Sequence, residues 1–288
     1  MNSFKSIISS LFGEKRNKQP ALCSIKIGGK PVSDFNLKRN VLVAGSAGTG
    51  KSVAISQMIE DARACGKKMV IYDKSGEYTQ KFFRPGIDVI VNPVEASCAD
   101  WNISADLKNS VFGKSTPKFT VRDFVSREDD ACLFLVSQQD HHEAIKPFVS
   151  AWIELALVKA MSMAPTSDIR LMFFLDELTS LSKIDAIYVA LTESRKIGIS
   201  IVVGIQNIGQ MEEIYGDELA RVLIANMQNR VIFRVEDERF AQYLEEMTFD
   251  EREGLPLLEK TELMIIPDLT SYVKLRGDHS FIKTEHQF

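Results

Sequence analysis

VLVAGSAGTGKS, residues 41–52, is the stretch that decides the fold of this chain. Its first four residues, Val41–Ala44, are all apolar and predict a buried strand. The rest fits the pattern G-x-x-x-x-G-K-S, whose glycines let the backbone turn its N–H groups around phosphate oxygens. A helix is expected from about Lys51 to Ala64, and the N-terminus of a helix favours an anion. The motif thus has a strand before it and a helix after it, which makes a chance glycine-rich turn the weaker interpretation.

The predicted phosphate-binding loop has eight residues: Gly45, Ser46, Ala47, Gly48, Thr49, Gly50, Lys51 and Ser52. Lys51 is expected to reach the β- and γ-phosphates of ATP, and the hydroxyl of Ser52 is expected to coordinate Mg²⁺. ATP and Mg²⁺ are therefore the cofactors that the motif predicts.

Composition limits the class of protein. The chain has 288 residues, 45% of them hydrophobic and 26% charged, which suits one large α/β domain or two small ones. The net charge is −4 and the pI is about 5.7, so any contact with DNA must be local. No apolar run approaches the roughly 20 residues that span a bilayer. The cysteines show neither close pairing nor metal-ligand spacing and predict reduced thiols in a cytoplasmic protein; they are Cys23, Cys65, Cys98 and Cys132.

Apolar strands alternate with helices along the chain, which predicts an α/β fold with a mostly parallel sheet and helices on both faces. Leu171–Leu175 and Ile199–Ile205 are continuous apolar runs, typical of strands buried on both faces. Two last strands are expected near Leu263–Ile266 and Ser271–Leu275. The helices predicted after the first are about His142–Met163, Ile184–Lys196, Asp217–Met227 and Asp237–Met247.

The domain organisation is expected to be simple. Residues 1–20 predict a flexible or amphipathic N-terminal tail, and residues 21–288 predict a single nucleotide-binding motor domain. Within that domain, residues 108–118 (KNSVFGKSTPK) have the composition of a linker.

Asp176 and Glu177 end the apolar run Leu171–Leu175, and this arrangement fits a Walker B motif. Ligands of open parallel sheets bind outside the carboxyl ends of the strands, so these two carboxylates are candidates for the nucleotide site. Asp176 is expected to hold Mg²⁺, and Glu177 to polarise the attacking water as general base. The alternative is a solvated acidic pair, which the upstream phosphate-binding loop makes weaker.

Other polar residues at strand and helix ends allow two interpretations each. Gln206 ends the next strand and either contacts the γ-phosphate and attacking water or is an ordinary strand-end amide. Asp73 either touches the water shell of the metal or a neighbouring subunit, or it belongs to a turn. Arg195 either caps its helix or supplies positive charge to a nucleotide on an adjacent subunit. His141 and His142 lack partners at metal spacing and are predicted at the surface.

These motifs together resemble the TraD/TraG-type coupling proteins of conjugative type IV secretion. The resemblance runs from about residue 22 to the C-terminus, and ESRKIGISIVVGIQNIGQM (residues 193–211) is its most specific part, because a phosphate-binding loop alone fits many NTPases. The other matching segments are GSAGTGKS (45–52), IYDKSGEY (71–78), VNPVEASCADWN (91–102), FFLDEL (173–178) and IPDLTSYVKLRGD (266–278).

The resemblance implies a RecA-like P-loop NTPase that works as a homo-hexamer. It also implies ATP-driven transfer of single-stranded DNA with bound relaxase, at a membrane-spanning type IV secretion channel. The alternatives are a degenerate nucleotide-binding remnant without translocation activity and a DNA pump similar to HerA or FtsK.

The sequence departs from this family in two ways. Members usually carry N-terminal transmembrane helices and an all-α domain inserted soon after the position of Trp101 and Asn102, and neither is seen here. The chain is therefore expected to be a motor core in the cytoplasm, or peripheral at the cytoplasmic face of the inner membrane through its partners. In place of the inserted domain, Lys108, Lys114 and Lys118 predict weak, sequence-independent binding to single-stranded DNA.

Overall fold

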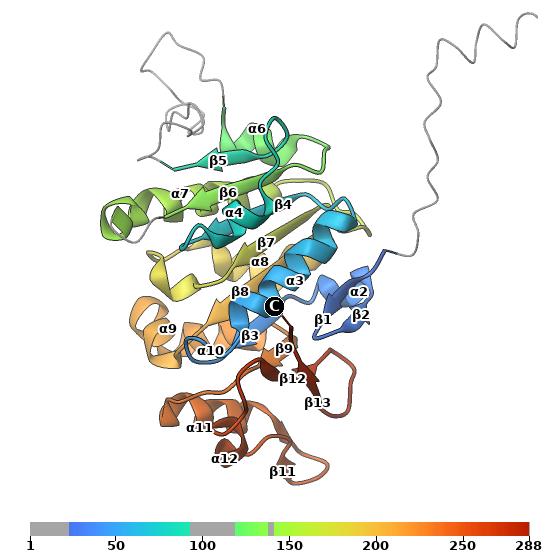
Figure 1. The fold of residues 1–288 in the computed structure, drawn as a ribbon, viewed down its shortest axis with the longest axis vertical. Coiled ribbons are helices and arrows are strands. Elements are labelled where there is room, and N and C mark those ends of the chain that lie inside the picture. Colours follow the sequence, from blue (N-terminus) through green and yellow to red (C-terminus); the bar gives the residue numbers. More distant parts are fainter. Residues whose placement is uncertain (1–22, 93–118, 138–140, 288) are drawn as a thin grey trace, which may run out of the picture.

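The structure is a computed structural model that describes residues 23–92, 119–137 and 141–287. The predicted tail at 1–20 and the predicted linker at 108–118, with its three lysines, lie outside these ranges. The described residues form a large twisted sheet with helices on both faces (Figure 1), which confirms the predicted α/β class. Among the described helices, none has both the length and the apolar character needed to cross a bilayer.

Within the described residues, the sheet has nine strands in the order β13-β12-β9-β3-β8-β7-β4-β6-β5. The strands from β9 to β5 are parallel, and β12 and β13 are added antiparallel at one edge. This order places β3 in the interior, between β9 and β8. The strands are β3 Val41–Ala44, β4 Met69–Asp73, β5 Val89–Val91, β6 Cys132–Val136, β7 Leu171–Leu175, β8 Ile199–Ile205, β9 Asn229–Ile232, β12 Thr270–Lys274 and β13 Ile282–Glu285.

Successive side chains of each central strand point to opposite faces, so the sheet separates two apolar cores. Leu42 and Ala44 of β3 belong to one core, and Val41 and Val43 belong to the other. The second core is covered by α2 Asp34–Leu37, α3 Lys51–Ala64 and α4 Glu77–Phe82. The first is covered by α6 Val121–Ser126, α7 His142–Met161, α8 Ala186–Glu193, α9 Ile208–Tyr215, α10 Asp217–Ala225 and α11 Glu238–Met247.

The prediction of a strand near Leu263–Ile266 is wrong. The short helix α12, Lys260–Leu263, ends there, and the Leu263 N–H donates to the Glu259 carbonyl at 3.0 Å. Four apolar residues in a row do not distinguish a strand from a buried helix end. The two further β elements of this region, β10 Phe249–Asp250 and β11 Leu255–Pro256, pair with each other in a two-stranded sheet. The strand expected at Ser271–Leu275 is present as β12.

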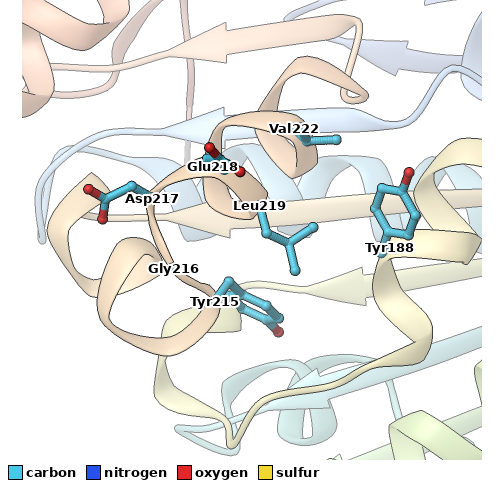
Figure 2. A pocket seen from close by; sticks show the side chains of 7 residues that line it. All are labelled: Tyr188, Tyr215, Gly216, Asp217, Glu218, Leu219 and Val222. Carbon is cyan, nitrogen blue, oxygen red and sulfur yellow. The ribbon is translucent and has the colours of Figure 1, made fainter.

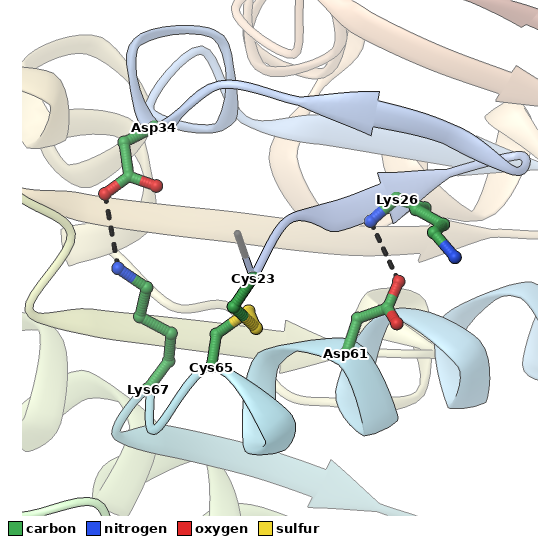
Figure 3. Close-up of a disulfide and its surroundings, with 6 residues drawn as sticks. All are labelled: Cys23, Lys26, Asp34, Asp61, Cys65 and Lys67. Atoms are coloured by element: carbon green, nitrogen blue, oxygen red, sulfur yellow. Dashed lines mark hydrogen bonds and ion pairs between the residues drawn. A yellow bond between two sulfur atoms is a disulfide. The ribbon is translucent and has the colours of Figure 1, made fainter. Parts of the chain in front are cut away.

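An N-terminal hairpin, β1 Ile25–Ile27 and β2 Lys30–Val32, packs beside α3 (Figure 3). Just before this hairpin, Cys23 forms a disulfide with Cys65, with a Cα–Cα distance of 5.4 Å. The prediction of reduced thiols is therefore wrong for this pair. The two cysteines are 42 residues apart in sequence, and only the packing of the hairpin on α3 brings Cys23 to the residue that caps the end of that helix. Cys132 is a buried free thiol, and Cys98 lies outside the described residues.

Candidate nucleotide-binding site

The phosphate-binding loop lies between β3 and α3 and is packed against two distant segments. A Cβ at Gly45 would lie 2.7 Å from the Cβ of Phe233, and a Cβ at Gly50 would lie 3.2 Å from the Cα of Leu269. The Leu269 N–H donates to the Thr49 carbonyl at 2.9 Å. Glycine is therefore required at these two places by the close approach of other parts of the chain.

Gly48 has the left-handed φ of 76°, and apart from its chain neighbours no described residue lies within 4 Å of the place where its Cβ would be. Only glycine adopts this conformation without penalty, and it leaves the backbone at the loop tip open to a ligand. The next helix, α3, begins at Lys51 without a side-chain cap at its N-terminus. The loop thus presents an open backbone and an uncapped helix end, both suited to bind phosphate.

Lys51 is 6% exposed, and its Nζ donates to the Ser46 carbonyl at 2.7 Å. Burial lowers the pKa of this ammonium, while the nearby negative charges of Asp176 and Glu177 oppose that shift. A buried cation with one neutral hydrogen-bond partner is a favourable place for a phosphate oxygen.

Ser52 and Asp176 meet across 124 residues of sequence, because the Ser52 hydroxyl donates to Asp176 Oδ2 at 2.8 Å. Tyr78 also donates to this oxygen, at 2.6 Å. The other oxygen, Oδ1, is buried and has no hydrogen-bond partner among the described residues. Burial raises the pKa of Asp176, and the two hydroxyl donors and Lys51 lower it. An unsatisfied carboxylate oxygen beside a serine hydroxyl fits Mg²⁺, which takes one or two protein ligands and completes its shell with phosphates and water.

The described residues contain no cluster of three or more acidic, histidine or cysteine side chains that would make a separate metal site. A cavity of about 460 Å³ adjoins the phosphate-binding loop, and Ser52, Gln57 and Tyr78 are among the residues that line it. The candidate site is thus open on the side of α3 and α4.

Glu177 follows Asp176, and its carboxylate forms an ion pair with Lys74 at 3.0 Å. Gln206 lies at the end of β8, the strand between β3 and β7. The structure therefore brings the ends of the phosphate-binding strand, the glutamine strand and the Walker B strand to one edge of the sheet. The side chains at that edge are the ones that the sequence predicts for the nucleotide site.

Asp73 is fully buried, and its interactions favour the turn interpretation. Its carboxylate accepts hydrogen bonds from the N–H groups of Gly76 and Thr79 and from the Thr79 hydroxyl, at 2.7–2.9 Å. These donors start helix α4. Asp73 therefore fixes the turn that carries Lys74.

Arg195 lies at the opposite edge of the sheet. It is an exposed residue of the short helix η3, Ser194–Lys196, immediately before β8. Because β3 and β8 are parallel, the start of β8 is far from the loop that follows β3. Burial lowers the pKa of Arg39, which precedes β3, and the positive charges of Arg276 and Arg195 lower it further. Arg195 therefore does not reach the phosphate-binding loop of its own chain.

The prediction that both histidines lie at the surface is wrong for His142, which is 8% exposed. Its ring bonds to the Ser137 hydroxyl and, at 2.9 Å, to the Ser180 carbonyl. His141 is exposed, as predicted. Adjacent histidines of a helix start point in different directions, and only tertiary packing decides which one is buried.

Tyr78 and Lys74 were not predicted as site residues, although Tyr78 donates to the carboxylate of Asp176 and Lys74 pairs with that of Glu177. Both belong to the segment IYDKSGEY, in which polar residues directly follow an apolar run. The strand-end position that identified Asp176 and Gln206 also marks Lys74, which follows β4, but it does not mark Tyr78, which lies inside α4.

A separate cavity of about 540 Å³ lies between α8 and the α9–α10 turn (Figure 2). Tyr188, Tyr215 and Leu219 point toward it, and Asp217 and Glu218 lie at its rim. None of the predicted nucleotide-site residues lines it.

The family model "Type IV secretion-system coupling protein DNA-binding domain" matches residues 24–112 and 110–253. The coupling protein TraD of Escherichia coli K12 is 25% identical over an alignment of 386 residues, which includes 90% of this chain and 54% of TraD. The chain thus spans about half the length of this relative. Since the alignment is longer than the chain, it contains segments of TraD without a counterpart here.

Solved structures show the same fold. The plasmid coupling protein TrwB in complex with ADP and Mg²⁺ matches with a TM-score of 0.81 and 21% identity, covering 92% of this chain and 88% of TrwB. The genome packaging NTPase B204 of Sulfolobus turreted icosahedral virus 2, in complex with ATP-γ-S, matches with a TM-score of 0.53 and 12% identity, covering 88% of this chain and all of B204. The predicted RecA-like P-loop NTPase fold is confirmed by the match to TrwB. With the family model matching most of its length, the chain belongs to the family of type IV secretion-system coupling protein DNA-binding domains.

Proposed function

We propose that this chain is the ATP-binding and ATP-hydrolysing motor domain of a conjugative DNA transfer coupling protein. The observation that carries the proposal is the contact between Ser52 and Asp176, 2.8 Å long, beside an unsatisfied oxygen of Asp176. Two motifs far apart in sequence meet there, and this meeting supports a site for a metal ion and phosphate. Family membership supports the further step to DNA transfer.

The phosphate-binding loop, Gly45–Ser52, would hold the phosphates through its backbone N–H groups. Lys51 would exchange its bond to the Ser46 carbonyl for oxygens of the β- and γ-phosphates. Ser52 and Asp176 would hold Mg²⁺, which neutralises phosphate charge when bound. TrwB, which shares the fold, binds ADP and Mg²⁺.

Glu177 would accept a proton from the attacking water, and Gln206 would orient that water or the γ-phosphate. Arg195 is too far from the phosphate-binding loop of its own chain to act there. In a ring, the exposed Arg195 would instead supply positive charge to the nucleotide of the next subunit. We therefore propose a homo-hexamer, in which each site is completed by a neighbour.

The partners proposed for the motor are single-stranded DNA, bound weakly and without sequence preference, the relaxase and the proteins of the type IV secretion channel. The relative TraD is a coupling protein, and the matching family model describes a DNA-binding domain. We propose that the motor works in the cytoplasm, held at the cytoplasmic face of the inner membrane by these partners.

The decisive experiment measures ATP hydrolysis with and without single-stranded DNA. We expect Mg²⁺-dependent turnover that DNA stimulates. Glu177→Gln keeps the shape of the site but removes the base, so it should bind ATP and fail to hydrolyse it. Lys51→Ala should abolish hydrolysis and weaken ATP binding, because it removes the cation that faces the phosphates.

Two outcomes would contradict the proposal. Normal turnover by Glu177→Gln would place the base elsewhere. A wild-type protein that binds ATP but does not hydrolyse it, with or without DNA, would instead support a nucleotide-binding remnant.

A further inference from the structure

The geometry points to Lys74 as a positioning residue that holds the general base Glu177 away from the nucleotide until a phosphate group of bound nucleic acid draws Lys74 off. This inference rests on the proposed function, because it assigns a regulator to the same base. It starts from the 3.0 Å ion pair between Lys74 Nζ and Glu177 Oε2.

The ion pair follows from strand register. Tyr72 of β4 is the partner of Leu175 of β7, so Lys74 and Glu177, each two residues further along, leave the sheet side by side. Both residues are carried by fixed turns. The Asp73 carboxylate holds the first turn, and the Ser180 hydroxyl and N–H hold the second by donating to the Glu177 carbonyl at 2.8 and 3.1 Å. The pair is therefore set by backbone geometry.

Strand order gives the pair a direction. The phosphate-binding strand β3 is separated from β7 by β8, while β4 lies on the other side of β7. An ion pair with Lys74 thus draws the Glu177 side chain toward β4, away from the phosphate-binding loop. Burial lowers the pKa of Lys51, and the charge of Glu177 opposes this shift, so the carboxylate still acts on the phosphate-binding lysine while it is paired with Lys74. Rotation of the Glu177 side chain would exchange the arrangement paired with Lys74 for one turned toward the nucleotide.

The pair is strong enough to orient Glu177 and weak enough to release it. The side chains of Lys74 and Glu177 are 32% and 23% exposed, so water screens their attraction in part. An ammonium group binds a phosphate oxygen as readily as a carboxylate. Because β4, which carries Lys74, lies on the side of β7 away from the phosphate-binding strand, and the Lys74 side chain is 32% exposed, a phosphate group arriving from solvent can approach Lys74 without displacing the nucleotide. When the Lys74 ammonium leaves the Glu177 carboxylate, Glu177 is free to turn toward the attacking water.

The test compares steady-state ATP hydrolysis by wild type and Lys74→Met, with and without a single-stranded DNA oligonucleotide. Methionine keeps the length of the side chain and removes its charge. We expect kcat without DNA to rise about two- to fivefold, the effect that loss of one partly exposed ion pair would give. The KM for ATP should stay unchanged, and stimulation by DNA should fall toward onefold.

Two further variants distinguish a specific restraint of Glu177 by Lys74 from a general effect of losing a lysine. Lys74→Arg can form the pair again and should restore the dependence on DNA. Lys183→Met removes a lysine from another ion pair, with Asp185 at 3.3 Å, and should behave as wild type. An unchanged or lower kcat for Lys74→Met without DNA, with stimulation preserved, would overturn the inference.

Binding of a fluorescent ATP analogue to the wild type separates this failure from failure of the proposed function. If the wild type binds the analogue and Lys74→Met shows no gain in turnover, only the restraint is refuted. If the wild type does not bind it, the proposed function fails and the restraint fails with it. A rise in kcat for Lys74→Met while the wild type does not respond to DNA would refute nucleic acid as the releasing phosphate.

Discussion

Reduction of the disulfide between Cys23 and Cys65 should lower the free energy of unfolding by an amount that follows from the length of the loop it closes. The bond closes a loop of 42 residues, and loop-closure entropy gives about 4 kcal/mol of free energy of unfolding for a loop of that size. For a cooperative chain of 288 residues, this corresponds to a fall in Tm of about 7 °C. The loop contains β3 and α3, so the bond ties both flanks of the phosphate-binding loop to the N-terminal hairpin.

The assay is urea unfolding of the wild type with and without a phosphine reductant, with mass spectrometry to count the bonded cysteines. Cys65→Ala is the matched control, because it cannot form the bond and should not respond to the reductant. Its stability should equal that of the reduced wild type to within the loss of one small side chain. Equal stability of bonded and reduced wild type would refute the entropic reasoning, and absence of the bond in the oxidised protein would refute the pairing itself.

Three further predictions concern single residues. Tyr78→Phe removes a 2.6 Å bond to the Asp176 carboxylate and should lower the free energy of unfolding by about 1.5–3 kcal/mol, whereas Tyr272→Phe, which frees a half-exposed glutamate, should lower it by less than about 1 kcal/mol; equal losses would contradict the assigned burial. Gly204→Ala places a Cβ 1.8 Å from the Asp176 carbonyl oxygen, so soluble protein should be at least about 3 kcal/mol less stable, and an unchanged urea midpoint would show that β8 lies further from Asp176. Burial lowers the pKa of His286 below its ordinary 6.5, so the unfolded chain binds a proton more readily than the folded chain does. The stability that neutral His286 contributes is complete above pH 6.5 and declines as pH falls toward the folded pKa. His286→Gln should therefore flatten this part of the curve of stability against pH, and parallel curves for the two proteins would refute the assignment.

The sequence predicts those parts of the site whose residues are contiguous and directly follow a single strand. The phosphate-binding loop and the Asp176-Glu177 pair are contiguous motifs, and parallel strands bring their ends to one edge whatever the rest of the chain does. The alternation of apolar runs likewise predicts the sheet and its two cores. These features depend on local sequence and on the general geometry of parallel sheets.

The features that were not predicted depend on which distant segments touch. Cys23 meets Cys65 only because the hairpin packs on α3, and His142 is buried only because Ser137 and Ser180 converge on it. The ion pair of Lys74 with Glu177 depends on β4 being the neighbour of β7. A single sequence does not state strand order, so contacts between strands remained out of reach. The helix at Lys260–Leu263 was missed because its apolar residues are too few to show a period.

The packing of the phosphate-binding loop against Phe233 and Leu269 has a consequence for synthesis on the ribosome. Gly50 is translated 219 residues before Leu269, which at about 5–20 residues per second is a delay of roughly 10 to 40 s. Both sheet neighbours of β3, which are β8 and β9, are also made after it. During this interval the nascent chain carries the complete G-x-x-x-x-G-K-S sequence without the surfaces that shape it. The ability to bind a nucleotide therefore arises late in translation, and bound nucleotide marks a chain whose last strands have already been added to the sheet.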